Sequence, residues 1–237
     1  MTCYDVQNMY EDVLDEKYLD RPRFYAKQDQ IGCELLSRYL IVGSTGSMKT
    51  NTALQLMLAH GDGVYHTFTV CCQSLQEPLY LWLQDHVAEE QRQGRVKWSI
   101  FCTDLKQLPS LQHYEKEKDL NHFVLLDDLI TSSKEDLKLI DPFFMKSRKA
   151  GIDLYVLSQD WTRIPLFWRR NFTYAAFKNI SARQLKRIAG DVTSDITPDR
   201  FVELYQQAMR RKQDWFFVDK SSSSQGNLSL MFRRNLG

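Results

Sequence analysis

The most informative segment of the sequence is Arg38-Tyr-Leu-Ile-Val-Gly43-Ser-Thr-Gly-Ser-Met-Lys49-Thr50. Its first five residues, Arg38 to Val42, form a short apolar run of the kind that fills a buried strand. A turn rich in glycine, serine and threonine follows, and the residues after Thr50 carry an apolar stripe at helical spacing. A strand, a glycine-rich turn and a helix in this order are the setting of a phosphate-binding loop.

In such a loop the backbone N–H groups point inward, and the helix N-terminus adds partial positive charge that favours phosphate. The segment therefore predicts binding of ATP with Mg²⁺. Lys49 is expected to reach the β and γ phosphates, and the Thr50 hydroxyl is expected to ligate magnesium. The predicted nucleotide-binding residues are Gly43, Ser44, Thr45, Gly46, Ser47, Met48, Lys49 and Thr50.

One position of the loop departs from the usual pattern G-x-x-x-x-G-K-[ST]. Met48 stands where the second glycine is expected. Glycine is favoured where the backbone approaches a ligand closely or adopts unusual torsions, whereas Met48 keeps its N–H but adds a Cβ. Two outcomes stay open: weaker nucleotide binding, or a loop that opens differently by using Gly46. A chance glycine–serine loop before a helix is the alternative to a phosphate loop.

Two carboxylates close another buried strand, since four apolar residues at 123–126 are followed by Asp127 and Asp128. Two acids at such a position are costly without a positive partner, and a magnesium ion beside the phosphate loop supplies one. Asp127 is predicted to hold the metal, through water, and Asp128 to position or deprotonate the attacking water. The alternative is a turn and helix cap before Ser132.

A polar side chain also ends the strand at 154–158, where Gln159 follows the apolar run. The carboxyl ends of parallel strands line one crevice, so Gln159 is expected near the γ phosphate, where it could orient water. A glutamine in an ordinary loop is the equal alternative. Loss of a γ phosphate needs charge compensation, often from an arginine of a neighbouring subunit. The candidates, each of which could also be a solvated surface residue, are Arg148, Arg163, Arg169 and Arg170.

The composition of the 237 residues is that of an ordinary globular protein, with 43% hydrophobic and 26% charged residues and a net charge of +1. A protein that coats duplex DNA is usually more basic, so contact with nucleic acid is expected through local patches or an assembly. The five cysteines form no C-x-x-C pair, which argues against a zinc site or a disulfide framework. Neither a signal peptide nor a membrane-spanning run is expected.

Strands that alternate with helices predict an α/β fold with a mostly parallel central sheet flanked by helices. We expect a lead-in segment over 1–30 and one domain over 31–237. The expected strands are 38–42, 64–72, 96–101, 121–128, 154–158, 171–178, 215–218 and 228–232. The expected helices are 50–60, 76–93, 132–149, 181–188 and 197–212.

These features together resemble the FtsK–HerA superfamily of ring ATPases. They are most similar to its viral genome-packaging branch, found in poxviruses, other large DNA viruses, virophages and polinton-like elements. The resemblance covers about 39–232 and includes the loop at 43–50 and residues 69–76 and 123–129. Its most telling stretch is 148–177, where a strand ending in Gln159 precedes Ile164-Pro165 and Arg170-Asn171-x-Thr173-Tyr174.

The resemblance implies a P-loop NTPase of RecA/FtsK–HerA type that threads double-stranded DNA into a capsid. It implies that Asp128 is the catalytic acidic residue, Gln159 a phosphate sensor and Arg148 a trans-acting arginine finger. The partners implied are double-stranded DNA, further copies in a ring of five or six, and portal or vertex proteins of a viral capsid. The expected location is the host-cell cytoplasm or a viral factory, with no membrane anchor in this chain.

Two other functions stay open from the sequence. One is a helicase-like or DNA-transfer ATPase of the same superfamily. The other is a slowly hydrolysing nucleotide-binding assembly module, for which Met48 is the only support. Three basic clusters could face DNA or simply be solvated, namely Lys186-Arg187, Arg210-Arg211-Lys212 and Arg233-Arg234.

Overall fold

A mixed sheet forms the centre of the computed structural model, which describes residues 32–61, 63–128, 133–193, 196–221 and 231–235. Within these residues the strand order is β3-β2-β4-β5-β1-β6-β7-β8. The strands are β1 (Arg38–Gly43), β2 (Thr67–Cys71), β3 (Trp98–Cys102), β4 (His122–Asp127), β5 (Ile152–Ser158), β6 (Tyr174–Lys178), β7 (Phe216–Asp219) and β8 (Phe232–Arg234). The first six pair in parallel, and β7 and β8 pair antiparallel.

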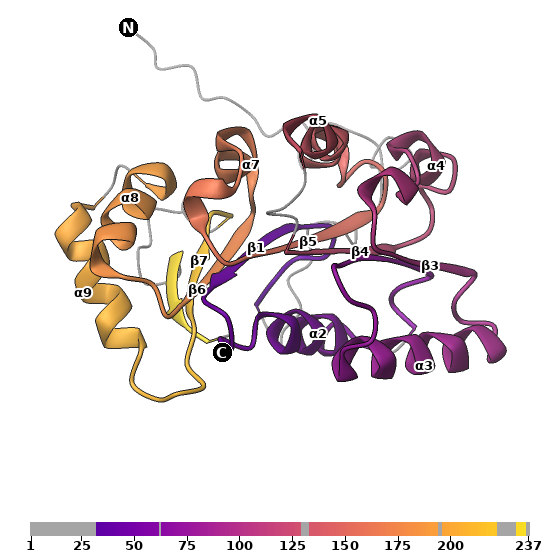
Figure 1. The fold of residues 1–237 in the computed structure, drawn as a ribbon, viewed down its shortest axis with the longest axis horizontal. Coiled ribbons are helices and arrows are strands. Elements are labelled where there is room, and N and C mark those ends of the chain that lie inside the picture. Colours follow the sequence, from indigo (N-terminus) through magenta and orange to yellow (C-terminus); the bar gives the residue numbers. More distant parts are fainter. Residues whose placement is uncertain (1–31, 62, 129–132, 194–195, 222–230, 236–237) are drawn as a thin grey trace, which may run out of the picture.

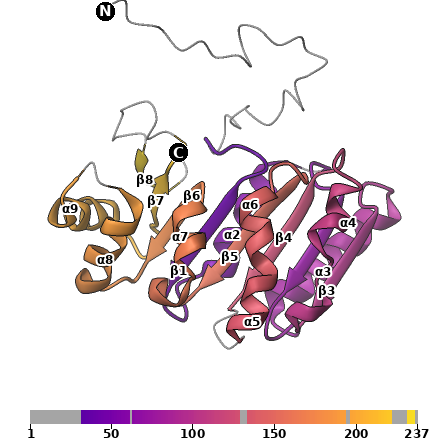
Figure 2. The same cartoon turned by 90° about the horizontal axis from the view of Figure 1, so that it is seen from above.

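Helices cover both faces of this sheet. Figure 1 shows α2 and α3 on one face and α4, α5 and α7 on the other, while α8 and α9 lie towards the β6–β8 end, as Figure 2 also shows. The α-helices are α2 (Lys49–Ala59), α3 (Pro78–Arg92), α4 (Leu111–Glu115), α5 (Lys134–Leu137), α6 (Asp141–Lys146), α7 (Leu166–Asn171), α8 (Ala182–Val192) and α9 (Pro198–Ala208). Short 3-10 turns are η3 (Leu105–Gln107), η5 (Lys138–Ile140) and η6 (Trp161–Arg163).

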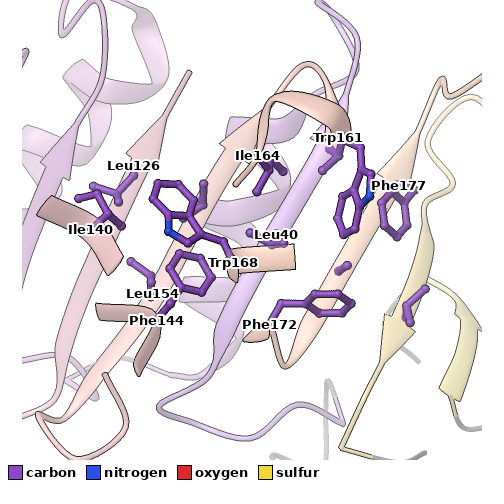
Figure 3. Close-up of a cluster of buried hydrophobic side chains, with 14 of the residues drawn as sticks. Leu40, Leu126, Ile140, Phe144, Leu154, Trp161, Ile164, Trp168, Phe172 and Phe177 are labelled. Carbon is purple, nitrogen blue, oxygen red and sulfur yellow. The ribbon is translucent and has the colours of Figure 1, made fainter. Parts of the chain in front are cut away.

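The strand side chains divide between two hydrophobic cores, one on each face. In β1, Tyr39 and Ile41 belong to the core under α2 and α3, and Leu40 belongs to the opposite core. This alternation follows from the two-residue repeat of a strand. Figure 3 shows part of the second core, where the rings of Phe144 and Trp168 stack with centroids 4.9 Å apart. Burial on both faces explains why these strands read as continuous apolar runs.

The strand order places β5 between β1 and β4. Val42 pairs with Ser158, and Asp127 pairs with Leu157. The carboxyl ends of β1, β4 and β5 therefore meet at one edge of the sheet, although the three strands are far apart in sequence. The predicted α/β fold with a mostly parallel sheet between helices is confirmed.

Three expected elements differ clearly from the structure. Most of the strand expected over 228–232 lies outside the described residues, and the last described strand, β8, is Phe232–Arg234. The helix expected over 132–149 is instead α5, η5 and α6, because Pro142 can occupy only the first turn of a helix and so begins a new one. The expected cap Ser132 lies outside the described residues, and the Ser133 hydroxyl accepts a hydrogen bond from the N–H of Asp136 at 3.1 Å. The strand expected over 171–178 begins only at Tyr174, since Asn171 ends α7.

Candidate active site

The phosphate-loop segment connects β1 directly to α2, as the sequence predicts. The turn is closed by a hydrogen bond from the N–H of Ser47 to the carbonyl of Ser44 at 3.1 Å. A Cβ on Gly43 would lie 2.6 Å from Ser47 Oγ and 2.7 Å from the carbonyl oxygen of Lys178. Position 43 therefore requires glycine because a Cβ would clash there. Position 46 favours glycine because its φ is +75°.

Met48 adopts the left-handed conformation that glycine favours. Its φ and ψ are 71° and 34°, and it is the residue that caps the N-terminus of α2. The left-handed region costs an ordinary residue roughly 1–2 kcal/mol because Cβ approaches the following carbonyl. The loop thus keeps the backbone path that its glycine pattern implies, and Met48 carries the strain.

Lys49 lies over the loop at the first position of α2. Its Nζ donates to the carbonyl oxygen of Gly43 at 3.0 Å and to that of Ser44 at 3.4 Å. Burial lowers the pKa of Lys49, while the nearby charges of Asp127 and Asp128 oppose that shift. The ammonium group is therefore held at the mouth of the loop, between the loop carbonyls and the two carboxylates.

Asp127 ends β4 as a buried carboxylate that accepts hydrogen bonds from hydroxyl groups. Oδ2 accepts from Thr50 Oγ1 at 3.0 Å and from the hydroxyl of Tyr80. Burial raises the pKa of Asp127, and the bonds from Tyr80 and Thr50 counteract part of that rise. The ion pairs among the described residues do not include Asp127 or Asp128. A buried carboxylate that has no ion-pair partner among the described residues is a position that favours metal binding.

Asp128 leaves the strand with a φ of 54°, a left-handed conformation that aspartate tolerates better than most residues. Its Oδ2 accepts a hydrogen bond from Gln159 Nε2 at 2.7 Å. Its backbone oxygen accepts one from Gln73 Nε2 at 2.9 Å. The other carboxylate oxygen, Oδ1, is buried and accepts no hydrogen bond from the described part of the chain. One acceptor is therefore left unpaired beside the loop.

Gln159 connects the phosphate loop to the acidic strand end. It follows β5, and its Oε1 accepts a hydrogen bond from Thr45 Oγ1 at 3.1 Å while its Nε2 donates to Asp128. The bridge exists because β5 lies between β1 and β4. The structure thus brings Gln159 into the site, as the expected meeting of parallel strand ends implies.

These groups surround a cavity of about 320 Å³ at the carboxyl edge of the sheet. Lys49 is the cation of its wall, against the carboxylates of Glu77, Asp127 and Asp128. The lining residues are Thr45, Gly46, Met48, Lys49, Thr50, Asn51, Cys72, Gln73, Ser74, Glu77, Leu79, Tyr80, Asp127, Asp128 and Gln159. Of the predicted loop residues, Gly43, Ser44 and Ser47 shape the turn without lining the cavity.

Magnesium fits this edge of the cavity. The Thr50 hydroxyl and the Asp127 carboxylate converge, and both are oxygen ligands of the kind magnesium prefers. The described residues contain no cluster of three His, Cys, Asp or Glu side chains that would hold a metal by themselves.

The candidate arginines do not reach this cavity within the chain. Arg148 lies before β5, at the amino edge of the sheet, and pairs with Glu34 at 3.1 Å. Arg169 pairs with Asp191. Arg163 and Arg170 are exposed on η6 and at the end of α7. A role for any of them in a nucleotide site would act across a subunit boundary, and it stays a prediction.

The basic clusters lie at the β6–β8 end of the sheet, in α8, directly after α9 and in β8. Lys186 on α8 pairs with Asp199 at 2.8 Å, and Arg211 pairs with Asp214 at 3.2 Å. Arg210, Arg233 and Arg234 line one open cavity of about 310 Å³ between α9, β7 and β8. The structure thus joins two clusters that are separate in the sequence.

Sequence reasoning missed the two residues outside the phosphate loop and the strand ends that bond to Asp127 and Asp128, namely Tyr80 and Gln73. Gln73 follows β2 at the same edge of the sheet, so the rule that identified Gln159 could have found it. Tyr80 lies in the first turn of α3, and its contact with Asp127 spans 47 positions, for which the sequence carries no signal.

The described cysteines Cys33, Cys71, Cys72 and Cys102 are buried and free, and Cys3 lies outside the described residues. Within the described residues, the helices are too short and too polar to cross a bilayer.

A family model described as Poxvirus A32 protein matches residues 33–232. No curated protein matches the chain in sequence. The fold is similar to B204, the DNA-packaging ATPase from Sulfolobus Turreted Icosahedral Virus, with 13% identity, a TM-score of 0.57 and coverage of 85% of this chain and 97% of that chain. The match to the genome packaging NTPase B204 from Sulfolobus turreted icosahedral virus 2 in complex with AMPPCP has 12% identity, a TM-score of 0.55 and coverage of 84% and 96%.

A third similar structure is Thermomonospora curvata EccC (ATPases 2 and 3) in complex with a signal sequence peptide. It has 12% identity and a TM-score of 0.54, and the alignment covers 84% of this chain and 36% of that chain. At such identities the likeness shows the fold. The expected P-loop ATPase fold, with a mostly parallel sheet between helices, is confirmed, and the family match confirms the resemblance to a poxvirus family.

Proposed function

The chain belongs to the poxvirus A32 protein family, and from this premise we propose that it is an ATPase that drives double-stranded DNA into a viral capsid. The observation that carries the proposal is the bridge formed by Gln159 between Thr45 of the phosphate loop and Asp128. It joins a phosphate cradle to a carboxylate with one unpaired oxygen. Such an arrangement suits attack of water on a terminal phosphate. The ATPases named among the similar structures support the same activity.

The loop at 43–50 would bind the phosphates of ATP through its backbone N–H groups and the N-terminus of α2. Lys49 would exchange the carbonyls of Gly43 and Ser44 for the β and γ phosphates, since it already lies at the mouth of the loop. Magnesium would be held by Thr50 and, through water, by Asp127. When bound, the ion supplies positive charge that stabilises the phosphate oxygens as the γ-phosphoryl group is transferred.

Asp128 would accept a proton from the attacking water at Oδ1, the oxygen that has no partner among the described residues. The water oxygen forms the new bond to the γ phosphorus, and the bond from that phosphorus to the β–γ bridging oxygen breaks. The products are ADP and inorganic phosphate. Gln159 would orient the water and report the presence of the γ phosphate, because its amide contacts both the loop and the carboxylate.

Among the described residues that line the cavity, Lys49 is the cation, and we propose that further compensation for the γ phosphate comes from another subunit. We propose Arg148 for this role, in a homo-oligomeric ring of five or six copies. Its side chain is 37% exposed at the amino edge of the sheet, remote from its own cavity. A ring also suits the near-neutral chain, because a few basic residues per copy form a charged pore by repetition.

The DNA-contacting residues are proposed among the basic clusters, of which Arg210 and Arg234 share one cavity wall. Capsid portal or vertex proteins are proposed partners, and the host-cell cytoplasm or a viral factory is the proposed location. We also propose that residues 31–237 form one ATPase domain preceded by a lead-in segment over 1–30. The strained backbone of Met48 would be the basis for the alternative, a slowly hydrolysing module.

The test is phosphate release from ATP by the full chain with magnesium, with and without double-stranded DNA, alongside the particle mass. The proposal expects turnover that DNA stimulates, in a particle of five or six copies. Binding of ATP without turnover in either condition would favour the slowly hydrolysing module instead.

A further inference from the structure

The hydroxyl of Tyr80 contacts the strand end that is proposed to hold magnesium. Tyr80 is 1% exposed and donates to Oδ2 of Asp127. The same oxygen accepts from Thr50 Oγ1 at 3.0 Å. Two hydroxyl groups from two different helices therefore fix one carboxylate oxygen, and that of Tyr80 comes from outside the phosphate loop.

The position of this hydroxyl is set by the start of α3. Pro78 occupies the first turn, and the N–H of Tyr80 donates to the carbonyl of Glu77 at 2.9 Å. The Gln84 amide donates to the carbonyls of Leu75 and Tyr80, each at 3.1 Å, which ties the preceding loop to the helix. The ring of Tyr80 is packed in the core under α2 and α3. The tyrosine thus has little freedom to move its hydroxyl.

The segment that carries Tyr80 also contacts the neighbouring carboxylate residue. Gln73, at the start of the same β2–α3 connection, donates to the backbone oxygen of Asp128 at 2.9 Å. Asp127 is therefore held through its side chain by the first turn of α3, and Asp128 through its backbone by the connection that leads into that helix. Gln73 and Tyr80 both line the cavity.

Partners that orient a metal-ligating carboxylate commonly change metal affinity when they are removed, although they do not touch the metal. We propose that Tyr80 is a positioning residue of the magnesium site, which holds the Asp127 carboxylate in the orientation that receives the hydrated ion. This inference rests on the proposed function, since it needs a nucleotide–magnesium complex in the cavity. It adds a residue outside the phosphate loop and the strand ends to the parts that assemble the site.

The alternative is that the hydroxyl of Tyr80 only stabilises the fold. The chain offers a matched control, because Tyr114 is equally buried and its hydroxyl bonds to Thr69 Oγ1 at 2.8 Å. Tyr114 belongs to the opposite core and does not line the cavity. Phenylalanine fills nearly the same volume at either position, so each variant loses one buried hydrogen bond and little else.

The test measures binding of a fluorescent ADP analogue by the full chain, first in EDTA and then over a range of magnesium concentrations. Tyr80→Phe is expected to bind the ADP analogue in EDTA with wild-type affinity. The magnesium concentration that produces half of the magnesium-dependent change in this affinity is expected to rise about 10–100-fold. Tyr114→Phe is expected to change neither quantity. In an Asp127→Asn background, Tyr80→Phe is expected to add no further loss, because its partner is already altered.

A magnesium dependence of Tyr80→Phe within twofold of wild type would overturn the inference, as would an equal shift in Tyr114→Phe. These outcomes leave the proposed function intact, since wild type still binds nucleotide with magnesium. Failure of the wild type to bind nucleotide in either condition would instead overturn the proposed function, and the inference with it.

Discussion

The side chain of Gln159 donates a hydrogen bond from Nε2 to Oδ2 of Asp128 at 2.7 Å. This contact leaves Oδ1 of Asp128 as the acceptor for a water molecule. Gln159→Ala is expected to lower kcat by roughly 100-fold with little change in KM, because the orientation of the attacking water is lost and the phosphate loop is kept. Steady-state phosphate release checks this. Gln93→Ala is the control, because the Gln93 amide donates to Glu89 on the surface of α3, away from the cavity, and equal rates in the two variants would refute the role.

Asp128→Asn is expected to bind ATP with nearly wild-type affinity while turnover falls by about 10²–10⁴-fold. The amide can still accept the bond from Gln159, but it cannot take a proton from water. Fluorescent nucleotide binding and phosphate release on the same preparation separate the two effects. Loss of ATP binding would show that Asp128 holds the nucleotide or its metal and does not act on the water.

Lys49→Ala is expected to reduce turnover by at least about 100-fold, since the ammonium group is the cation of the cavity wall. Lys97→Ala is the control, because its side chain is exposed and pairs with Glu117 away from the cavity. Phosphate release measures both. Unchanged turnover in Lys49→Ala would contradict the assignment of the phosphate loop.

Met48→Gly is expected to preserve or tighten nucleotide binding, because glycine adopts the observed φ of 71° without strain. Met48→Ala keeps the Cβ and so keeps the strain, which makes it the matched comparison. Nucleotide titrations and urea unfolding of both variants test the prediction, with a gain of up to about 1 kcal/mol in unfolding free energy for glycine alone. Weaker binding in Met48→Gly than in Met48→Ala would mean that the strained backbone itself is required.

Replacement by alanine is expected to be harmful at Gly43 and stabilising at Gly190. Gly43→Ala would place Cβ 2.6 Å from Ser47 Oγ and 2.7 Å from a backbone oxygen, so the loop must shift and nucleotide binding should fall. Gly190→Ala lies within α8 with open space around the new methyl group. It should raise the unfolding free energy by about 0.5–1 kcal/mol through helix propensity alone. Urea unfolding and nucleotide titration check both, and a neutral Gly43→Ala would contradict the observed crowding.

Much of this site could be predicted from local sequence. The strand, turn and helix at 38–60 are specified by neighbouring residues, and polar groups after buried strands mark the carboxyl edge of a parallel sheet. That rule identified Asp127, Asp128 and Gln159. It could also have placed Arg148 at the opposite edge, since Arg148 precedes its strand.

The remaining features depend on contacts between distant residues. The strand order, with β5 between β1 and β4, decides that Gln159 reaches both Thr45 and Asp128, and no local pattern encodes it. The contact of Tyr80 with Asp127 likewise depends on how α3 packs on the sheet. The left-handed backbone of Met48 is imposed by the path of the loop against the preference of its own side chain.

We propose that ATP hydrolysis moves the protein along double-stranded DNA. The most direct measurement is ATP-dependent displacement of a third strand from a DNA triplex, with the full chain, magnesium and the Asp128→Asn variant as control. Displacement by wild type, together with DNA-stimulated turnover, and none by Asp128→Asn is the predicted result. Turnover of ATP that DNA does not stimulate, with the third strand left in place, would contradict movement along DNA.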